Sequence, residues 1–569
     1  MFESDDLEVD VSSSDELIFH EGDVSDNEGP PPFTAGSWLV SIGWLEFQDE
    51  SVKIPLAGLI AAVSMNHDKD DELVASKGDI KWMNHFITTT VEKTLKLPRE
   101  LVQGVIPLAT MTDIHAADLA RSLLEQPIEF RQKAVGELLA LSVLNIGFKD
   151  ERYDSRTHRC IRQVAAELQV DERTLRGMEE VIADLLISGT FTNAMSEDEE
   201  LAKKSKSRSR KFKIGGAAAL GAVLVGVTGG LAAPAIGASL AAWGGTAALG
   251  TFMASAGGVA VFTTMFAAAG GGLTGYKMNK RVGGKLSEFE FHPVVVFPRV
   301  KRALTASIFV SGWHDAELVD RLKHLESDQE SIESEWTSAC TGDSLGESFQ
   351  LVWETKVLKA VAETLTSFAI DQAVGRAAQE VLKTTVLASF MAAIAWPSLI
   401  LSASNIIDSN WAVGLNKSKI AGEELGRALM SGAHGRRPVT LIGYSLGAAV
   451  VFHALEYLCR FQKEADNFVL DVVLIGAPVT TSQASWNRIR RVTAGSVINC
   501  YIPNDWILML LFRYSTISVA ELAGLSPIQC PGVDNLSLSE IDGVSSTMNI
   551  RDNLPCIMKL VDGTMKKTR

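Results

Sequence analysis

A serine flanked by two glycines stands where a short apolar strand is expected to meet a helix. The strand is predicted over Pro438 to Ile442 and the helix over Ala448 to Leu458. The residues between them are Gly443, Tyr444, Ser445, Leu446 and Gly447. In a G-x-S-x-G turn the serine is strained and its hydroxyl is exposed, and bulkier neighbours would clash with the strand and the helix. The chemistry expected of Ser445 is nucleophilic attack on an acyl carbonyl.

Backbone amides beside this serine could hold the charge that develops on the attacked oxygen. The residue after the nucleophile supplies one such donor, which here is Leu446. The sequence Ser311-Gly312-Trp313-His314 follows an earlier apolar strand, at the place where hydrolases of this kind present their second donor. We therefore assign Trp313 and Leu446 as the oxyanion-binding residues.

An acid is expected after a later strand. Asp505 follows the strand Val497 to Ile502, and it comes after the serine in the chain order Ser, Asp or Glu, His of α/β-hydrolases. Asp471 is the competitor, but it lies at the start of its strand, which is the wrong end. Ser445 and Asp505 are thus the predicted catalytic pair.

The general base is the missing member. His453 is the only histidine that follows Ser445, and it lies along the nucleophile helix. No histidine follows Asp505. This absence matters because removing a member of a catalytic triad lowers the rate by several orders of magnitude. His314, beside the oxyanion residues, is a weak candidate for an unconventional base.

The elements that must position these residues alternate between strand and helix. Further strands are predicted over Leu304 to Val310, Phe349 to Trp353 and Phe468 to Ile475, with helical patterns between them. This alternation predicts parallel β/α units, and we assign an α/β-hydrolase domain to residues 288–562. The uncharged run Thr384 to Ile407 is interpreted as a lid or a buried insertion, since a membrane crossing there would split the sheet.

A second uncharged stretch, from Ile214 to Tyr276, is 63 residues long. Basic residues flank both of its ends, and the length suffices for two spans of about 20 residues each. Because positive flanks stay cytosolic, we predict a Gly/Ala-rich transmembrane hairpin within residues 203–285, with both soluble parts on the cytosolic side of an intracellular membrane. A buried Ala/Gly core hairpin, or a segment that inserts reversibly, is the alternative.

The N-terminal part contains no recognisable chemistry. Residues 1–32 hold eleven acidic and no basic residues, and they account for most of the chain's net charge of −16. This segment is expected to be disordered. Within them Leu17, Ile18 and Phe19 could dock a cytosolic partner, or the whole segment could be a solvating tail. Residues 33–200 have helical periodicity and are predicted to form an all-helical domain.

Composition restricts the classes of partner. The acidic balance, with no basic stripe, argues against nucleic acid. Six scattered cysteines have neither metal-ligand spacing nor disulfide density, so we expect a reducing compartment, no metal and no cofactor. No signal peptide is expected from the acidic N-terminus. The mean hydropathy of +0.13 reflects the uncharged stretches and favours membrane lipid as a partner.

Several of these motifs together resemble the transmembrane and coiled-coil domain-containing protein 4 family, whose members carry a DUF726 hydrolase-like domain. They are Ser311-Gly312-Trp313, the serine turn, Gly476-Ala477-Pro478, Asn504-Asp505-Trp506 and the upstream Tyr153-Asp154-Ser155-Arg156. The resemblance implies a membrane-associated, lipase-like or esterase-like serine hydrolase. Relatives carry a Gly-His pair where this chain has Gly543-Val544, which implies either a lineage that has lost activity or an altered C-terminus.

Two functions therefore compete at this stage. The first is a membrane-tethered serine hydrolase that acts on lipid or acyl ester substrates through Ser445. The second is a hydrolase-like scaffold or trafficking adaptor at a membrane, which the missing histidine favours.

Overall fold

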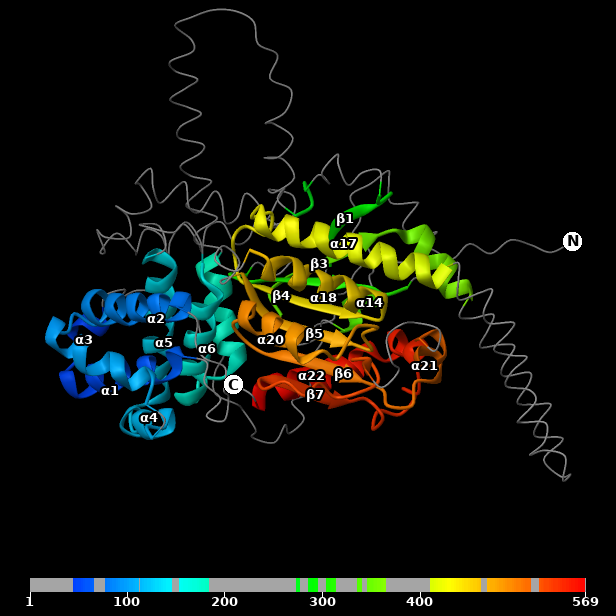
Figure 1. Cartoon of the computed structure of the whole chain (residues 1–569). Coiled ribbons are helices and arrows are strands. Elements are labelled where there is room, and N and C mark those ends of the chain that lie inside the picture. The colour runs from blue at the N-terminus through cyan, green and yellow to red at the C-terminus, as the bar shows by residue number, and fades with distance from the viewer. Residues whose placement is uncertain are drawn as a thin grey trace, which may run out of the picture. The chain divides into compact units, whose positions relative to one another are not determined.

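The structure is a computed structural model in which two kinds of architecture follow one another. It describes residues 44–65, 77–111, 113–145, 153–183, 273–276, 285–294, 303–313, 335–339, 345–364, 410–461, 468–512 and 521–567. Up to residue 183 the described chain is helical, and from residue 289 onward it forms a mixed α/β sheet with helices on both sides (Figure 1). The predicted α/β class and the predicted N-terminal helical region are both confirmed, and the sheet is mixed because one edge strand is antiparallel.

Short and medium helices make up the N-terminal region. They are α1 (Glu50–Ser64), α2 (Lys77–Thr89), α3 (Arg99–Val105), α4 (Ala116–Leu124), α5 (Ile128–Asn145), α6 (Ser155–Glu167) and a helix over 172–183, with short turns η2 (Leu45–Phe47), η3 (Thr90–Thr94) and η4 (Ile106–Ala109). The start of α6 is fixed by Asp154, whose carboxylate accepts a hydrogen bond from the backbone amide of Arg156 at 2.9 Å. None of the described helices is long and apolar enough to cross a bilayer.

Seven strands form one sheet in the order β1-β3-β2-β4-β5-β6-β7. They are β1 (Phe289–Pro293), β2 (Ala306–Val310), β3 (Glu347–Trp353), β4 (Val439–Tyr444), β5 (Val469–Ile475), β6 (Val497–Tyr501) and β7 (Val533–Ser537). All neighbours are parallel except β1, which pairs antiparallel with β3 at the edge. The central strands β2, β4 and β5 are buried along their whole length, as expected for a parallel sheet covered on both faces.

Alternate residues of each strand enter two separate apolar layers. On one face, Ile308 and Leu441 pack in the layer formed with α17 (Ala412–Met430), α18 (Leu446–Cys459) and α20 (Gln483–Val492). On the other face, Phe309 and Ile442 pack in the layer that includes α14 (Glu335–Ala339) and α22 (Leu554–Lys567). This three-layer arrangement leaves the carboxyl ends of the parallel strands as the edge at which loops converge.

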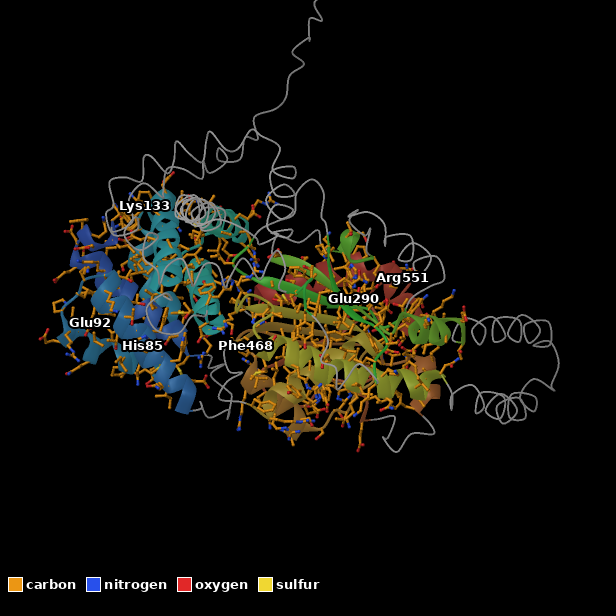
Figure 2. The ribbon with its side chains drawn as sticks, turned by 90° about the horizontal axis from the view of Figure 1, so that it is seen from above. His85, Glu92, Lys133, Glu290, Phe468 and Arg551 are labelled. Atoms are coloured by element: carbon orange, nitrogen blue, oxygen red, sulfur yellow. The ribbon has the colours of Figure 1, made fainter. Side chains whose placement is uncertain are left out.

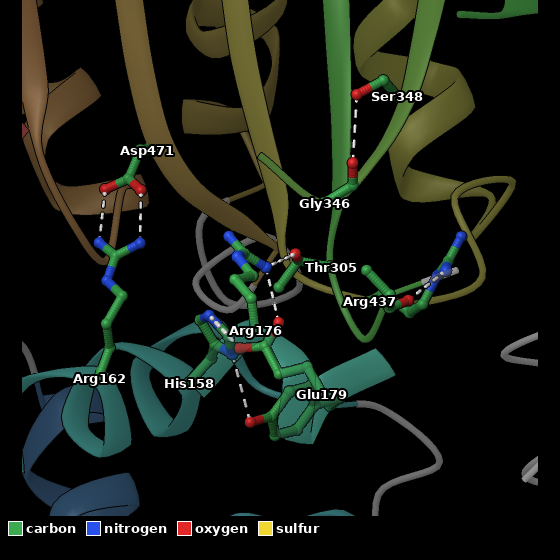
Figure 3. Close-up of polar contacts among 11 residues, drawn as sticks. His158, Arg162, Arg176, Glu179, Thr305, Gly346, Ser348, Arg437 and Asp471 are labelled. Carbon is green, nitrogen blue, oxygen red and sulfur yellow. Dashed lines mark hydrogen bonds and ion pairs between the residues drawn. The ribbon is translucent and has the colours of Figure 1, made fainter. Parts of the chain in front are cut away.

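The N-terminal helices contact the opposite edge, where the strands begin. Arg162 of α6 donates to both carboxylate oxygens of Asp471, near the start of β5, at 3.1 and 3.3 Å. Arg176 donates to the hydroxyl of Thr305, just before β2, at 3.0 Å (Figure 3). In Figure 2 Phe468, which precedes β5, lies beside these helices, whereas Arg551 lies toward the other end of the sheet. Among the described residues, these contacts of the helical region thus lie at the edge where the parallel strands begin.

The last four residues of the long uncharged stretch belong to this sheet domain. Leu273 is buried in the layer that contains α17, and the hydroxyl of Tyr276 donates to Glu424 of α17 at 2.9 Å. The rest of the predicted hairpin, the acidic tail 1–32 and the predicted lid 384–407 lie outside the described residues.

Candidate active site

Ser445 forms a sharp turn between β4 and α18. Its backbone angles are φ 50° and ψ −125°, a combination that is strained for a residue with a side chain. A β-carbon on Gly443 would lie 2.6 Å from the carbonyl oxygen of Gly447, and one on Gly447 would lie 2.6 Å from the carbonyl carbon of Val310. Both positions thus exclude any side chain, and the turn has the geometry of a nucleophile elbow.

The hydroxyl of Ser445 is buried, with 1% of the residue exposed. Its oxygen has no hydrogen-bond partner among the described residues. Ser445 also caps the N-terminus of α18, where the helix dipole favours negative charge. A buried hydroxyl without a partner in the described part of the chain, placed at a helix N-terminus, is suited to react and poorly suited to a structural role.

The loop Ser311–Trp313 follows β2 and lies directly against this elbow. A β-carbon on Gly312 would be 2.6 Å from the β-carbon of Ser445 and 2.8 Å from the backbone nitrogen of Leu446. Two hydrogen bonds fix this loop. The Ser311 carbonyl accepts from Trp353 Nε1 at 3.1 Å, and the Trp313 carbonyl accepts from the Tyr444 hydroxyl at 3.0 Å. The structure therefore brings the two predicted oxyanion-binding residues, Trp313 and Leu446, to the same turn as Ser445. His314 lies outside the described residues.

Asp505 is fully buried between β6 and α21 (Trp506–Phe512). One carboxylate oxygen caps α21 by accepting from the amides of Ile507 and Leu508, each at 3.1 Å. The other accepts from the amide of Thr547 at 2.6 Å and from the Thr547 hydroxyl. Burial raises the pKa of the Asp505 carboxyl above its ordinary value, and these hydrogen bonds oppose the shift. Asp505 follows the carboxyl end of its strand, whereas Asp471 is engaged by Arg162 at the other edge.

No imidazole occupies the place beside Asp505 within the described part of the chain. His453 lies on α18 with its Nδ1 3.0 Å from Glu456 Oε2, and 23% of its side chain is exposed. Val544 is buried in the apolar layer that contains α22. Thr547, three residues further on, is the side chain that bonds Asp505, and no motif in the sequence identifies it.

A buried polar cluster, which the sequence did not predict either, lies beside the loop Ser311–Trp313. It consists of Ser311, Glu335, Tyr444 and Arg551, which come from four separate segments. No motif marks Glu335 or Arg551 in the sequence, because their contacts arise only when the loops converge. Among the described residues, no group of three or more His, Cys, Asp or Glu side chains lies close enough to hold a metal ion.

Comparison with known proteins places this site in a family context. Residues 206–564 match the family model described as "Protein of unknown function (DUF726)". The transmembrane and coiled-coil domain-containing protein STS1 of rice (Oryza sativa subsp. japonica) is 35% identical over 415 residues, covering 70% of this chain and 60% of the rice protein. The uncharacterized membrane protein F35D11.3 of Caenorhabditis elegans is 34% identical over 446 residues, covering 77% of this chain and 67% of that protein.

A more distant relative has a name that refers to an activity. The probable lipase MIL1 of Saccharomyces cerevisiae is 29% identical over 274 residues, which cover 48% of this chain and 24% of the yeast protein. The chain therefore spans only part of the length of its relatives. No solved structure matches the chain.

Proposed function

We propose that this chain, which belongs to the DUF726 family, is a membrane-tethered serine hydrolase of the α/β-hydrolase type. In this proposal it cleaves lipid or acyl esters. The observation that carries this proposal is the close fit of the elbow and the loop beside it. Ser445, with its strained backbone, and Gly312, with no room for a β-carbon, place the serine and the backbone nitrogen of Leu446 directly against the loop that follows β2.

In this mechanism Ser445 Oγ attacks the ester carbonyl and forms a tetrahedral intermediate. The amides of Leu446 and Trp313 hold its oxyanion, and the alkoxide of the substrate leaves when the carbonyl re-forms. The proton of Ser445 must pass to a base and then to the leaving group. In this chain the candidate base is His314, which follows the oxyanion residue Trp313 in sequence.

The choice of an apolar ester substrate has two supports. The yeast relative carries the name probable lipase. The uncharged run 384–407 precedes the elbow in sequence, where a lid over an acyl-binding site would be inserted. Relatives named as membrane proteins support the membrane tether. The uncharged stretch supports it as well. Residues 273–276 belong to the sheet domain, and residues 214–272 are still enough for two spans.

A fluorophosphonate probe tests the proposal, because it labels only an activated serine. The full chain in detergent micelles is treated with the probe, beside Ser445→Ala and the matched control Ser539→Ala, which changes an exposed serine after β7. We expect labelling of the wild type and of Ser539→Ala, and its loss in Ser445→Ala. Its loss in His314→Ala as well would assign the base. A folded wild type without labelling would reject the hydrolase.

The second candidate is a hydrolase-like scaffold or trafficking adaptor at the membrane. It is favoured by one observation, the two hydrogen bonds from Thr547 to the Asp505 oxygen that an imidazole would need. Under this alternative the elbow is retained as architecture, and Ser445 stays unlabelled while the protein remains membrane-bound.

Both soluble parts are proposed to lie on the cytosolic side of an intracellular membrane. The basic residues on both sides of the uncharged stretch support an even number of crossings. Protease digestion of sealed vesicles should therefore degrade the helical region and the sheet domain together. Protection of the sheet domain alone would contradict this topology.

A further inference from the structure

Glu335, at the start of α14, is a buried carboxylate beneath the proposed active site, with 4% of its side chain exposed. One of its oxygens accepts hydrogen bonds from the hydroxyls of Ser311 and Tyr444, the latter at 3.0 Å. The other oxygen pairs with Arg551 Nε at 2.8 Å. Three partners around one buried carboxylate require an explanation, because burying a charge costs free energy unless it is well paired.

The three partners come from the three segments that build the site. Ser311 begins the oxyanion loop, and Tyr444 is the residue before the nucleophile. Arg551 lies in the turn after Thr547, which bonds Asp505, and its guanidinium carbon is also 5.9 Å from the centre of the Trp313 ring. A single side chain thus contacts the donor loop, the elbow and the segment that holds the acid.

The hydrogen-bond directions around this carboxylate are constrained. The Ser311 hydroxyl accepts from Trp336 Nε1 at 3.0 Å and from Gln350 Nε2 at 3.2 Å, so its one proton is given to Glu335. The Tyr444 hydroxyl has one proton between the carbonyl of Trp313 and Glu335, each at 3.0 Å. The loop Ser311–Trp313 is therefore bonded to Glu335 directly through Ser311, while the single proton of Tyr444 is shared between the loop carbonyl and Glu335.

We propose that Glu335 is the positioning residue of this site, which holds the oxyanion loop, the nucleophile elbow and the acid-supporting segment in register. The inference rests on the proposed function only for its effect on catalysis. Its structural part, a link between three loops through one carboxylate, stands on the contacts alone. Burial raises the pKa of the Glu335 carboxyl, and the hydrogen bond from Ser311 and the charge of Arg551 oppose that rise.

Two substitutions separate the links. Glu335→Ala removes all three, whereas Glu335→Gln keeps a carbonyl oxygen for Ser311 and Tyr444 but loses the charge opposite Arg551. Glu290→Ala, which changes an exposed carboxylate on β1, is the matched control. All three are made in the full chain in detergent micelles.

The first measurement is amide hydrogen exchange, resolved by peptide. In Glu335→Ala we expect exchange about tenfold faster in peptides covering 308–313, 440–448 and 545–552, with 469–475 in β5 unchanged. In Glu335→Gln only 545–552 should be accelerated. A general loss of packing would not separate the segments in this way. Unchanged exchange in Glu335→Ala, or an equal increase in every segment, would overturn the inference.

The second measurement is the rate of fluorophosphonate labelling at Ser445. Displacements of about 1 Å cost about a hundredfold in rate, so Glu335→Ala should label ten- to a hundredfold more slowly, with Glu335→Gln between it and the wild type. Equal labelling rates in all variants would reject the catalytic role. If the wild type itself is not labelled, the proposed function fails, and the exchange pattern alone supports or overturns the positioning role.

Discussion

The backbone of Gly312 lies so close to Ser445 that a β-carbon on the glycine would be 2.6 Å from the serine's β-carbon. Real side chains do not approach so closely, so the loop after β2 and the elbow after β4 form one fitted unit. The register of the two strands accounts for this, because Val310 pairs with Gly443 and both strands end at the same edge. Two segments more than 130 residues apart are thereby fixed against each other.

The first prediction concerns that contact. Gly312→Ala should destabilise the sheet domain by about 1 to 3 kcal/mol through overpacking, and it should abolish probe labelling at Ser445. The matched control is Gly104→Ala in α3, where an added β-carbon meets nothing within 4 Å and should stabilise by roughly 0.5 to 1 kcal/mol. Thermal melting and labelling of the two variants measure both effects. A Gly312→Ala protein with unchanged melting and labelling would show that the loop can move aside.

The second prediction concerns the pH dependence that Asp505 confers. Its folded-state pKa is raised by burial, so its favourable contribution is present below the ordinary aspartate pKa of about 3.9 and is lost as pH rises through the folded value. The Asn variant lacks this titration. The free energy of unfolding of the wild type relative to Asp505→Asn should therefore fall as pH rises through that window.

Urea unfolding of both proteins between about pH 3.5 and 7 measures this difference, because all other titrating groups cancel in the comparison. Asp552→Asn, on the exposed turn near Arg551, is the matched control for replacing an aspartate by asparagine. A difference between wild type and Asp505→Asn that grows with pH would mean that the hydrogen bonds from Thr547 and α21 outweigh burial.

The sheet was more predictable than the site. Strands rich in buried apolar residues, such as Val469–Ile475, are easy to predict, because a strand covered on both faces is mostly apolar. The edge strands Phe289–Pro293 and Val533–Ser537 were missed as strands, since each carries polar residues on its exposed positions. The elbow was predictable because its requirement for glycine is local in sequence.

The polar contacts of the site could not be predicted in the same way. Thr547 reaches Asp505 across 42 residues, and Glu335 pairs with Arg551 from a distant part of the chain, so no spacing in the sequence records these contacts. The prediction that Val544 stands in place of a catalytic histidine rests on the family resemblance. In the relatives a Gly-His pair follows a run like Val533–Ser537. In the structure Thr547 bonds the same Asp505 oxygen that a histidine at position 544 would need.

The third prediction concerns the ion pair between the helical region and the sheet. Arg162 and Asp471 are both buried, so Arg162→Met breaks a buried ion pair and should destabilise by about 3 to 5 kcal/mol. Arg121→Met is the matched control, since Arg121 and Asp118 form an exposed pair worth at most about 1 kcal/mol. Thermal melting of the full chain distinguishes them. Equal melting temperatures would show that the two regions are not coupled through this pair.

The last prediction concerns the missing base. If Val544 stands where relatives carry the histidine, Val544→His supplies an imidazole, but Thr547 still holds the Asp505 oxygen that must orient it. Removing the Thr547 hydroxyl leaves only the backbone amide on that oxygen, so one acceptor position becomes available for Nδ1. The double variant Val544→His/Thr547→Ala should therefore be labelled by the fluorophosphonate faster than Val544→His, and Thr547→Ala alone should gain nothing.

Every increase in the labelling rate must disappear when Ser445→Ala is added. Asp505→Asn should reduce the increase strongly, because the asparagine side chain favours the wrong imidazole tautomer. Val544 is also part of the apolar layer with Ile550 and Leu554, so melting curves are needed to show that the histidine is accommodated. A stable double variant that is labelled no faster than the wild type would mean that residue 544 does not face the elbow. In that case wild-type labelling that is lost in His314→Ala would assign the proton transfer to the oxyanion loop instead.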